Sequence, residues 1–220
     1  MNTLTTSIRR IINIKFKYIS KATQGKSFNL LDVGAGNRSA SKTMAVFPNC
    51  NYYGLDMDKN TDYIEADFKQ MKDFYELDLT KLNYDSVPNA FFDYINMAHV
   101  IEHLHNGDLV LPLLLQKLKP GGHFYIEFPG KKSLTLPSMY GTLNFHDDPT
   151  HVRVYSVAEL TPIFAAYNCT ILSSGIRRNW YYILATPVRI LISLLQIGKI
   201  RANVFWDILG FAEYLYVVKK

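Results

Sequence analysis

Short apolar runs alternate with longer stretches of helical periodicity along most of this chain. The apolar runs have the length of strands, and several are followed by glycine, proline or aspartate. This alternation is typical of βαβ units and predicts an α/β fold built on a mostly parallel sheet. The predicted strands are Asn29–Val33, Tyr52–Leu55, Phe74–Leu77, Tyr94–Met97, His123–Phe128, Thr170–Ser174 and Tyr214–Val218.

Helices are predicted between several of these strands. One of them begins with a capping box, because Ser156 is followed three residues later by Glu159. Pro120 and the pair Gly121-Gly122 mark the point where another helix has ended and the fifth strand follows. The predicted helices are Ser39–Phe47, Gly107–Leu118 and Val157–Tyr167.

Two further segments combine apolar and basic residues. Ile8–Ile19 has apolar residues at helical spacing on one face, so residues 1–28 are predicted to hold a basic amphipathic helix that acts as a lid or a membrane contact. Residues 177–209 interrupt the short link expected between the last two strands, and this insertion is predicted to act near the site or on a partner. Its apolar run contains Pro187 and Arg189, which favours an interfacial or buried position over a membrane span.

Charge is distributed unevenly over the 220 residues, whose formal net charge is +5. Residues 1–26 carry six basic groups and no acid, and residues 175–220 carry seven basic and two acidic groups. An acidic middle suits a cationic cofactor, whereas basic ends suit an anionic partner such as lipid headgroups. Cys50 and Cys169 form no ligand-spaced pair, which favours reduced thiols. These features predict a cytoplasmic protein with peripheral contact at the inner membrane face.

The first predicted strand runs into a glycine turn that opens a helix. Gly34 and Gly36 allow the backbone to turn tightly and approach a ligand closely. Ser39 replaces the third glycine of the dinucleotide fingerprint, which disfavours NAD and an oxidoreductase. Asp56 ends the second strand twenty residues after Gly36, where such folds place a ribose-binding carboxylate, and Asp78 follows the third strand. The three strand ends therefore predict a site for a nucleoside-containing cofactor.

Over about Asn29–Val218 these motifs resemble the class I S-adenosylmethionine-dependent methyltransferase superfamily. Five segments match its motifs in order: LLDVGAGNRS, YYGLDMD, ELDLTKL, FFDYINMAHVIEHL and LKPGGHFYIEFPG. The resemblance implies a Rossmann-like, seven-stranded, mostly parallel sheet with an antiparallel last strand and helices on both faces, formed by a methyltransferase domain at residues 29–220. It also implies S-adenosyl-L-methionine as the cofactor.

The same resemblance assigns roles to individual residues. Gly34 and Gly36 would line the methionine moiety, Asp56 would bind the ribose, and Asp78 would accept from the adenine amino group beside the Leu79 backbone. The predicted cofactor-binding residues are Asp32, Gly34, Gly36, Asp56, Met57, Asp78, Leu79 and Asn96.

Methyl transfer to an oxygen also requires removal of the acceptor proton, and histidine is the usual base near neutral pH. His99 follows the fourth strand, and His151 lies in the segment DDPTHVRVYS. That segment resembles a loop over the acceptor site of bacterial methyltransferases encoded with surface-polysaccharide genes. We therefore predict His151 and His99 as catalytic residues, and O-methylation of a glycan or small-molecule acceptor as the function.

A metal-dependent alternative rests on the spacing His99-x-x-Glu102-His103. It resembles the Glu-x-x-Glu-His metal motif of small-RNA 3′-terminal 2′-O-methyltransferases and of a ubiquinone-pathway methyltransferase, and His146 or His151 would complete the ligand set. A histidine replaces the first glutamate, so no metal site is predicted. The basic ends also leave another nucleic-acid methyltransferase open, but the fourth strand lacks an Asn-Pro-Pro-Tyr motif. Nucleic acid is therefore not the preferred partner. The intact glycines and aspartates disfavour a non-catalytic binding subunit.

Overall fold

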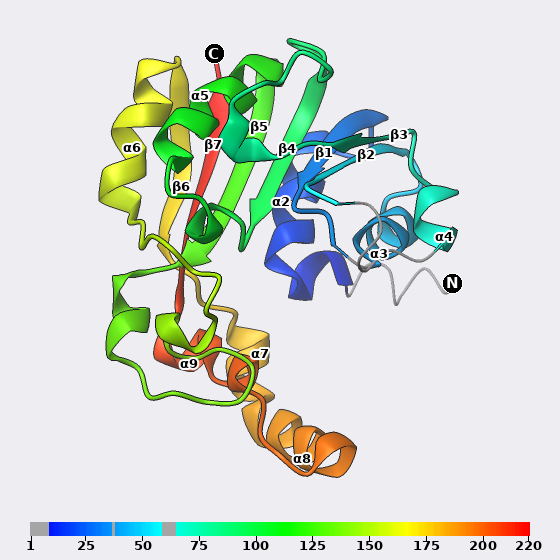
Figure 1. The fold of residues 1–220 in the computed structure, drawn as a ribbon. Coiled ribbons are helices and arrows are strands. Elements are labelled where there is room, and N and C mark those ends of the chain that lie inside the picture. The colour runs from blue at the N-terminus through cyan, green and yellow to red at the C-terminus, as the bar shows by residue number, and fades with distance from the viewer. Residues whose placement is uncertain (1–8, 37, 59–64) are drawn as a thin grey trace.

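The structure is a computed structural model, and it describes residues 9–36, 38–58 and 65–220 (Figure 1). The described residues form a seven-stranded sheet with the strand order β3-β2-β1-β4-β5-β7-β6. Each strand overlaps one of the strands predicted from the sequence. The strands are β1 Phe28–Val33, β2 Cys50–Asp56, β3 Asp73–Glu76, β4 Phe92–Ala98, β5 Leu118–Pro129, β6 Cys169–Ile176 and β7 Ala212–Lys219.

Strand β7 runs antiparallel to both of its neighbours, β5 and β6, whereas β1 to β5 pair in parallel. The predicted mostly parallel sheet with an antiparallel last strand is confirmed. β1 and β4 are neighbours in the sheet but not in the sequence, so the strand order reverses between them. The carboxyl edge of the sheet beside such a reversal is the usual ligand-binding position in open α/β folds.

Helices cover both faces of the sheet, as predicted (Figure 1). Successive strand side chains point to opposite faces, so Leu31 of β1 packs with the core under α5 and α6, and Leu30 packs with the core under α2 and α3. The helices are α2 Ile14–Thr23, α3 Ser39–Val46, α4 Glu65–Phe68, α5 Gly107–Lys117, α6 Val157–Ala166, α7 Trp180–Leu184, α8 Thr186–Ile197 and α9 Trp206–Leu209.

Two elements differ from the sequence prediction by more than two residues at a boundary. Ile8 lies outside the described residues, and the helix predicted to run to residue 19 is interrupted at Asn13. The Asn13 backbone is extended, and its side chain accepts a hydrogen bond from the Phe16 N–H, so α2 starts there and continues to Thr23. Strand β5 starts at Leu118, five residues early, because Leu118 pairs with Phe92 before the register shifts near Tyr94.

Residues 177–209, the predicted insertion, lie between β6 and β7. Figure 1 shows α8 at the end of the molecule, away from the sheet. The insertion contacts the N-terminal helical segment, since the Asn179 side chain donates to the Ile12 carbonyl. It also packs against the loop before α6 through a small apolar cluster around Leu143 and Phe211. Within the described residues, none of the helices is both long enough and apolar enough to span a bilayer.

Candidate active site

A cavity of about 470 Å³ opens at the carboxyl edge of the sheet, where β1, β2 and β4 end. It brings together most of the residues predicted from the sequence to bind the cofactor. Gly34, Asp56, Met57, Asp78 and Leu79 all line it. The remaining lining residues are Leu55, Leu77, Thr80, His99, Val100, His103, Leu104 and Thr150.

The glycine turn fits this cavity for a steric reason. Gly34 has a φ of +66°, and a Cβ added there would lie 2.2 Å from the Val100 Cγ2 atom. A side chain at this position would therefore be strained and would collide with the turn after β4. Gly36 also has a positive φ, and its N–H donates to the Asp56 carboxylate at 3.4 Å. Gly36 thus supports the Asp56 side chain, although it is not among the lining residues.

Two carboxylates lie along the cavity wall. Asp56 accepts a hydrogen bond from the Met57 N–H at 2.8 Å. Asp78 accepts from the hydroxyl and the N–H of Thr80, at 2.6 and 3.0 Å, and these bonds lower the pKa of the Asp78 carboxyl. Ionised carboxylates at this position suit a ligand that offers hydroxyl or amino donors.

Asp32 and Asn96, also predicted to bind the cofactor, lie beneath the cavity and not on its wall. Both are almost fully buried, and the Asn96 amide donates to Asp32 at 2.5 Å. Asp32 also accepts from Tyr52, Ser39 and Lys15 of α2, the last at 2.8 Å. The N-terminal helix is therefore tied by an ion pair to the strand that carries the glycine turn.

His99 follows β4 directly and has a left-handed backbone conformation, with a φ of +56°. Its Nδ1 lies 3.2 Å from Glu102 Oε1, and its Nε2 lies 3.0 Å from Glu127 Oε1. Burial lowers the pKa of the imidazole, but the two carboxylates outweigh this effect and raise it to about 9. Both ring nitrogens are therefore occupied as donors, so His99 is poorly placed to take a proton from an acceptor.

A buried charge network extends from His99 into the insertion. Arg177 lies 3.4 Å from Glu127 and 3.0 Å from Asp207. Burial raises the pKa of Glu127, but Arg177, His99 and the Tyr125 hydroxyl lower it to about 2. Glu127, Arg177 and Asp207 were not among the site residues predicted from the sequence. Glu127 stands within an apolar strand, and Arg177 and Asp207 are thirty residues apart in the insertion, so no local pattern connects them.

A second, smaller cavity of about 190 Å³ adjoins the first, and His99 and His103 line both. One of its walls is aromatic, because Trp206 stacks on Phe211 with ring centroids 4.7 Å apart. The other lining residues are Glu102, Pro129, Gly141, Thr142, Asp148 and His151.

The loop that carries His151 is held by Asp147. This carboxylate accepts the N–H groups of Met139, Leu143 and Asn144, and these bonds outweigh burial and lower its pKa to about 2. The His151 Nδ1 lies 2.7 Å from the Phe145 carbonyl, which can only accept. His151 therefore carries its ring proton on Nδ1 and has its lone pair on Nε2. Of the two predicted catalytic histidines, His151 faces only the second cavity, whereas His99 lies between the two.

A family model described as a methyltransferase domain matches residues 8–174 of the 220. The chain belongs to this methyltransferase family. A search of curated protein sequences found no match.

Several solved structures of methyltransferases are similar to this chain over most of its length. An S-adenosylmethionine-dependent methyltransferase from Mesorhizobium loti is 14% identical with a TM-score of 0.60, and the match covers 92% of this chain and 96% of that one. A putative methyltransferase from Haloferax volcanii, solved with the activator Trm112, is 12% identical with a TM-score of 0.63 and coverages of 98% and 94%.

A third structure contains a bound ligand. The 1,6-didemethyltoxoflavin-N1-methyltransferase from Burkholderia thailandensis, solved with S-adenosylhomocysteine, is 14% identical with a TM-score of 0.55 and coverages of 99% and 77%. At these identities each likeness shows a shared fold. The family match and these structural likenesses together identify the protein as an S-adenosylmethionine-dependent methyltransferase.

Proposed function

We propose that this methyltransferase transfers the methyl group to a hydroxyl of a small-molecule or glycan acceptor bound in the second cavity. The observation that carries this proposal is that the two cavities adjoin at His99 and His103. Methyl transfer is an in-line displacement, so donor and acceptor must face each other across a short distance. Two adjoining cavities, one with carboxylates and one with histidines and an aromatic wall, meet this requirement.

The cofactor side of the proposal follows the chemistry of the first cavity. Asp56 would accept from the ribose hydroxyls, and Asp78 from the adenine amino group next to the Leu79 backbone. Gly34 and Gly36 leave room for the methionine moiety, and Met57 lines the wall beside Asp56. Asp32 and Asn96 would act as positioning residues, because the hydrogen bond between their side chains joins β1 to β4 near the carboxyl ends of both strands.

On the acceptor side, we assign removal of the hydroxyl proton to His151. Its Nε2 lone pair is available because Nδ1–H is engaged by the Phe145 carbonyl, and its side chain lines the second cavity. The reaction then forms a carbon–oxygen bond at the methyl group and breaks the carbon–sulfur bond of the sulfonium. Among the described residues, no lysine or arginine lines either cavity. The lining therefore offers no cationic side chain for the phosphates of a nucleic-acid acceptor.

The cofactor assignment predicts that Asp56→Ala weakens S-adenosylhomocysteine binding. Charge-assisted hydrogen bonds to the ribose would be lost, which costs about 1–3 kcal/mol, or about 5- to 150-fold in affinity. Isothermal titration calorimetry on the purified protein measures this difference. Asp85→Ala is the matched control, because Asp85 is exposed and lies outside this cavity. Binding of NADH without binding of the adenosyl ligand would contradict the proposal.

We further propose that the insertion rests on an anionic membrane surface. Trp180, Leu184 and Leu195 are 69%, 79% and 77% exposed, although they are large apolar residues. Residues 178–206 include four basic residues and no acidic one. The basic N-terminal segment lies beside the insertion, because Arg9 and Ile12 line a common cavity with Tyr182. Apolar side chains flanked only by positive charge suit the interface of a bilayer that contains acidic lipids.

This surface predicts co-sedimentation with vesicles that contain phosphatidylglycerol. Binding should be strong at low salt and fall as salt screens the attraction. Replacing both Leu184 and Leu195 with glutamate should abolish it, whereas Leu109→Glu should not, because Leu109 is also an exposed leucine, at 54%, but lies on α5. Equal binding to neutral vesicles would contradict the electrostatic part, and no binding to either kind would contradict the whole proposal.

A further inference from the structure

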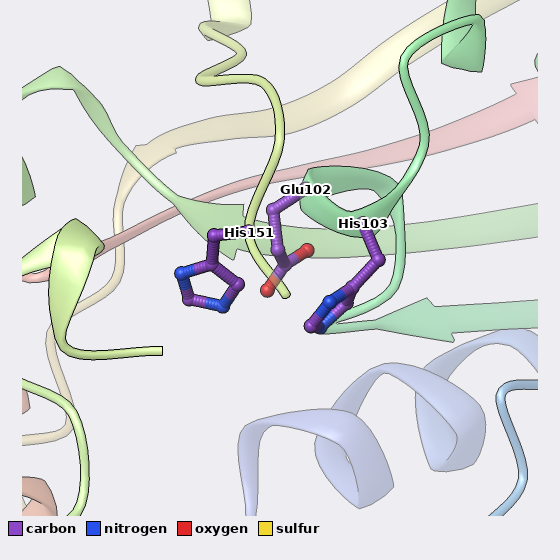
Figure 2. Close-up of side chains that lie close together, drawn as sticks. All are labelled: Glu102, His103 and His151. Carbon is purple, nitrogen blue, oxygen red and sulfur yellow. The ribbon is translucent and has the colours of Figure 1, made fainter. Parts of the chain in front are cut away.

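Three side chains converge on one wall of the second cavity. Glu102, His103 and His151 each place a potential ligand atom so that all three atoms lie within 4.8 Å of one another. Figure 2 shows the Glu102 carboxylate between the two imidazole rings. The ring centroids of His103 and His151 are 4.9 Å apart. Two of these residues come from the turn after β4, and the third comes from the loop before α6.

Hydrogen bonds fix the tautomer of both histidines. The Thr150 hydroxyl donates to Asp148 at 2.5 Å, so its oxygen can only accept from His103 Nδ1, which lies 2.9 Å away. His103 Nδ1 also lies 3.1 Å from the Thr150 carbonyl. His151 donates its Nδ1–H to the Phe145 carbonyl. In the neutral tautomer of either ring that these bonds select, the lone pair is on Nε2, and metal-binding histidines are commonly oriented by such a bond from the other nitrogen.

Glu102 has an oxygen that lacks a partner. Its side chain is 1% exposed, and Oε1 is bonded to His99. No hydrogen-bond partner for Oε2 is found among the described residues. A buried carboxylate oxygen without a partner is costly, and such a group calls for a ligand or an ion.

The backbone holds the two halves of the cluster together. The N–H groups of Val152 and Arg153 both donate to the Glu102 carbonyl, at 2.9 and 3.2 Å. Asp148 Oδ2 lies 3.8 Å from His151 Nε2 and adds a second negative charge beside the cluster. The arrangement is therefore framed by main-chain bonds and does not depend on long flexible side chains alone.

We propose, against our expectation from the sequence, that Glu102, His103 and His151 bind a divalent transition-metal ion. Two imidazoles and one carboxylate form a ligand set typical of Zn²⁺, Fe²⁺ and Co²⁺. Ligands about 2.1 Å from such an ion lie about 3.4 Å apart in a tetrahedron, so ligand atoms now within 4.8 Å of one another need to approach by up to about 1.4 Å. His99 is not part of this set, because both of its nitrogens are bonded to carboxylates.

The inference rests on the proposed function in one respect: the metal site lies in the cavity that we assign to the acceptor. All three ligand residues line that cavity, so the open positions of the ion face the acceptor. A divalent ion lowers the pKa of an oxygen that binds to it. With Nδ1 engaged by the Phe145 carbonyl, the ion would take the Nε2 lone pair of His151. His151 would then act as a ligand of the ion in place of the direct base, and the acceptor proton would be released to solvent.

Titration of the purified protein with Co²⁺ tests the site without any activity measurement. The protein is first stripped with EDTA and dialysed, and Co²⁺ is added while visible absorption and calorimetric heat are recorded. We expect one Co²⁺ per chain, with the absorption bands of an ion bound to nitrogen and oxygen ligands. His103→Ala and Glu102→Gln should each lower the affinity by about 100-fold or more, because changes outside the ligand shell alone cost about 10- to 100-fold.

His146→Ala is the matched control, since His146 is an exposed histidine of the same loop that lies outside the cluster. It should bind Co²⁺ like the wild type. Absence of stoichiometric binding to the wild type, or equal binding by His103→Ala and His146→Ala, would overturn the proposal. Circular dichroism and the thermal unfolding midpoint, measured on the same samples, show that each variant is folded. S-adenosylhomocysteine binding to the wild type separates the two proposals, because the cofactor site can fail while the metal site holds, and the reverse.

Discussion

Replacing His151 with alanine is expected to lower turnover by about 10²- to 10⁴-fold while S-adenosylhomocysteine affinity barely changes. The side chain is 5% exposed and lines the acceptor cavity, but not the larger cavity that holds the carboxylates. Its loss therefore removes the group that promotes deprotonation and leaves the cofactor contacts intact. Formation of S-adenosylhomocysteine, followed with a panel of nucleotide sugars and glycans until one supports wild-type turnover, measures the rate.

Two companion variants make this result specific. His146→Ala should keep near-normal turnover, because His146 is exposed and does not line the cavity. His103→Ala reports on the role of the ion. If His151 acts through a bound ion, both histidine variants should lose rate to a similar extent, whereas a direct base would make His103→Ala the milder change. Near-normal turnover of His151→Ala on an acceptor that the wild type methylates would refute the assignment.

The gathering of the strand-end residues around one cavity was predictable because its signals are local. A glycine turn after a buried strand, and an aspartate at the end of the next strand, are visible in short stretches of sequence. Parallel pairing then carries these strand ends to one edge without further information. Gly34, Asp56 and Asp78 consequently lie around one cavity, as expected. The strand pattern and the family motifs predicted the fold for the same reason.

The acceptor side depends on contacts between distant segments, which no local pattern contains. Glu102 and His151 are 49 residues apart, and the pairing of the Val152 and Arg153 N–H groups with the Glu102 carbonyl brings them together. The spacing of His99, Glu102 and His103 resembles a metal motif in which all three positions are ligands. Instead, a left-handed residue at His99 turns its ring toward Glu127 and leaves the other two near His151. Backbone conformation of this kind cannot be read from residue spacing.

The second large effect is expected at Arg177, whose replacement by methionine should destabilise the fold by about 3–5 kcal/mol. Arg177 is 14% exposed and lies between Glu127 and Asp207, which are 8% and 1% exposed. Removing the guanidinium leaves the buried Asp207 carboxylate without its ion-pair partner and leaves Glu127 with His99 alone. Urea unfolding followed by circular dichroism measures the loss. Arg201→Met is the matched control, because Arg201 is an exposed arginine of the same insertion and should change stability by less than about 0.5 kcal/mol.

The dependence of this loss on pH and on Asp207 identifies its cause. Burial already raises the pKa of Asp207, and Arg177 is the main group that opposes this effect. Without Arg177 the pKa of Asp207 should rise further above its unfolded value. The penalty is then present above that folded pKa and shrinks as the pH falls through it, because a protonated carboxyl needs no counter-charge. Adding Asp207→Asn to Arg177→Met should recover part of the lost stability, because it removes the unpaired charge. The amide oxygen of the new asparagine can still accept the N–H of Asn179, the residue that caps α7. A double variant no more stable than Arg177→Met alone, or a penalty that is constant with pH, would show that lost packing against Trp206, and not buried charge, causes the effect.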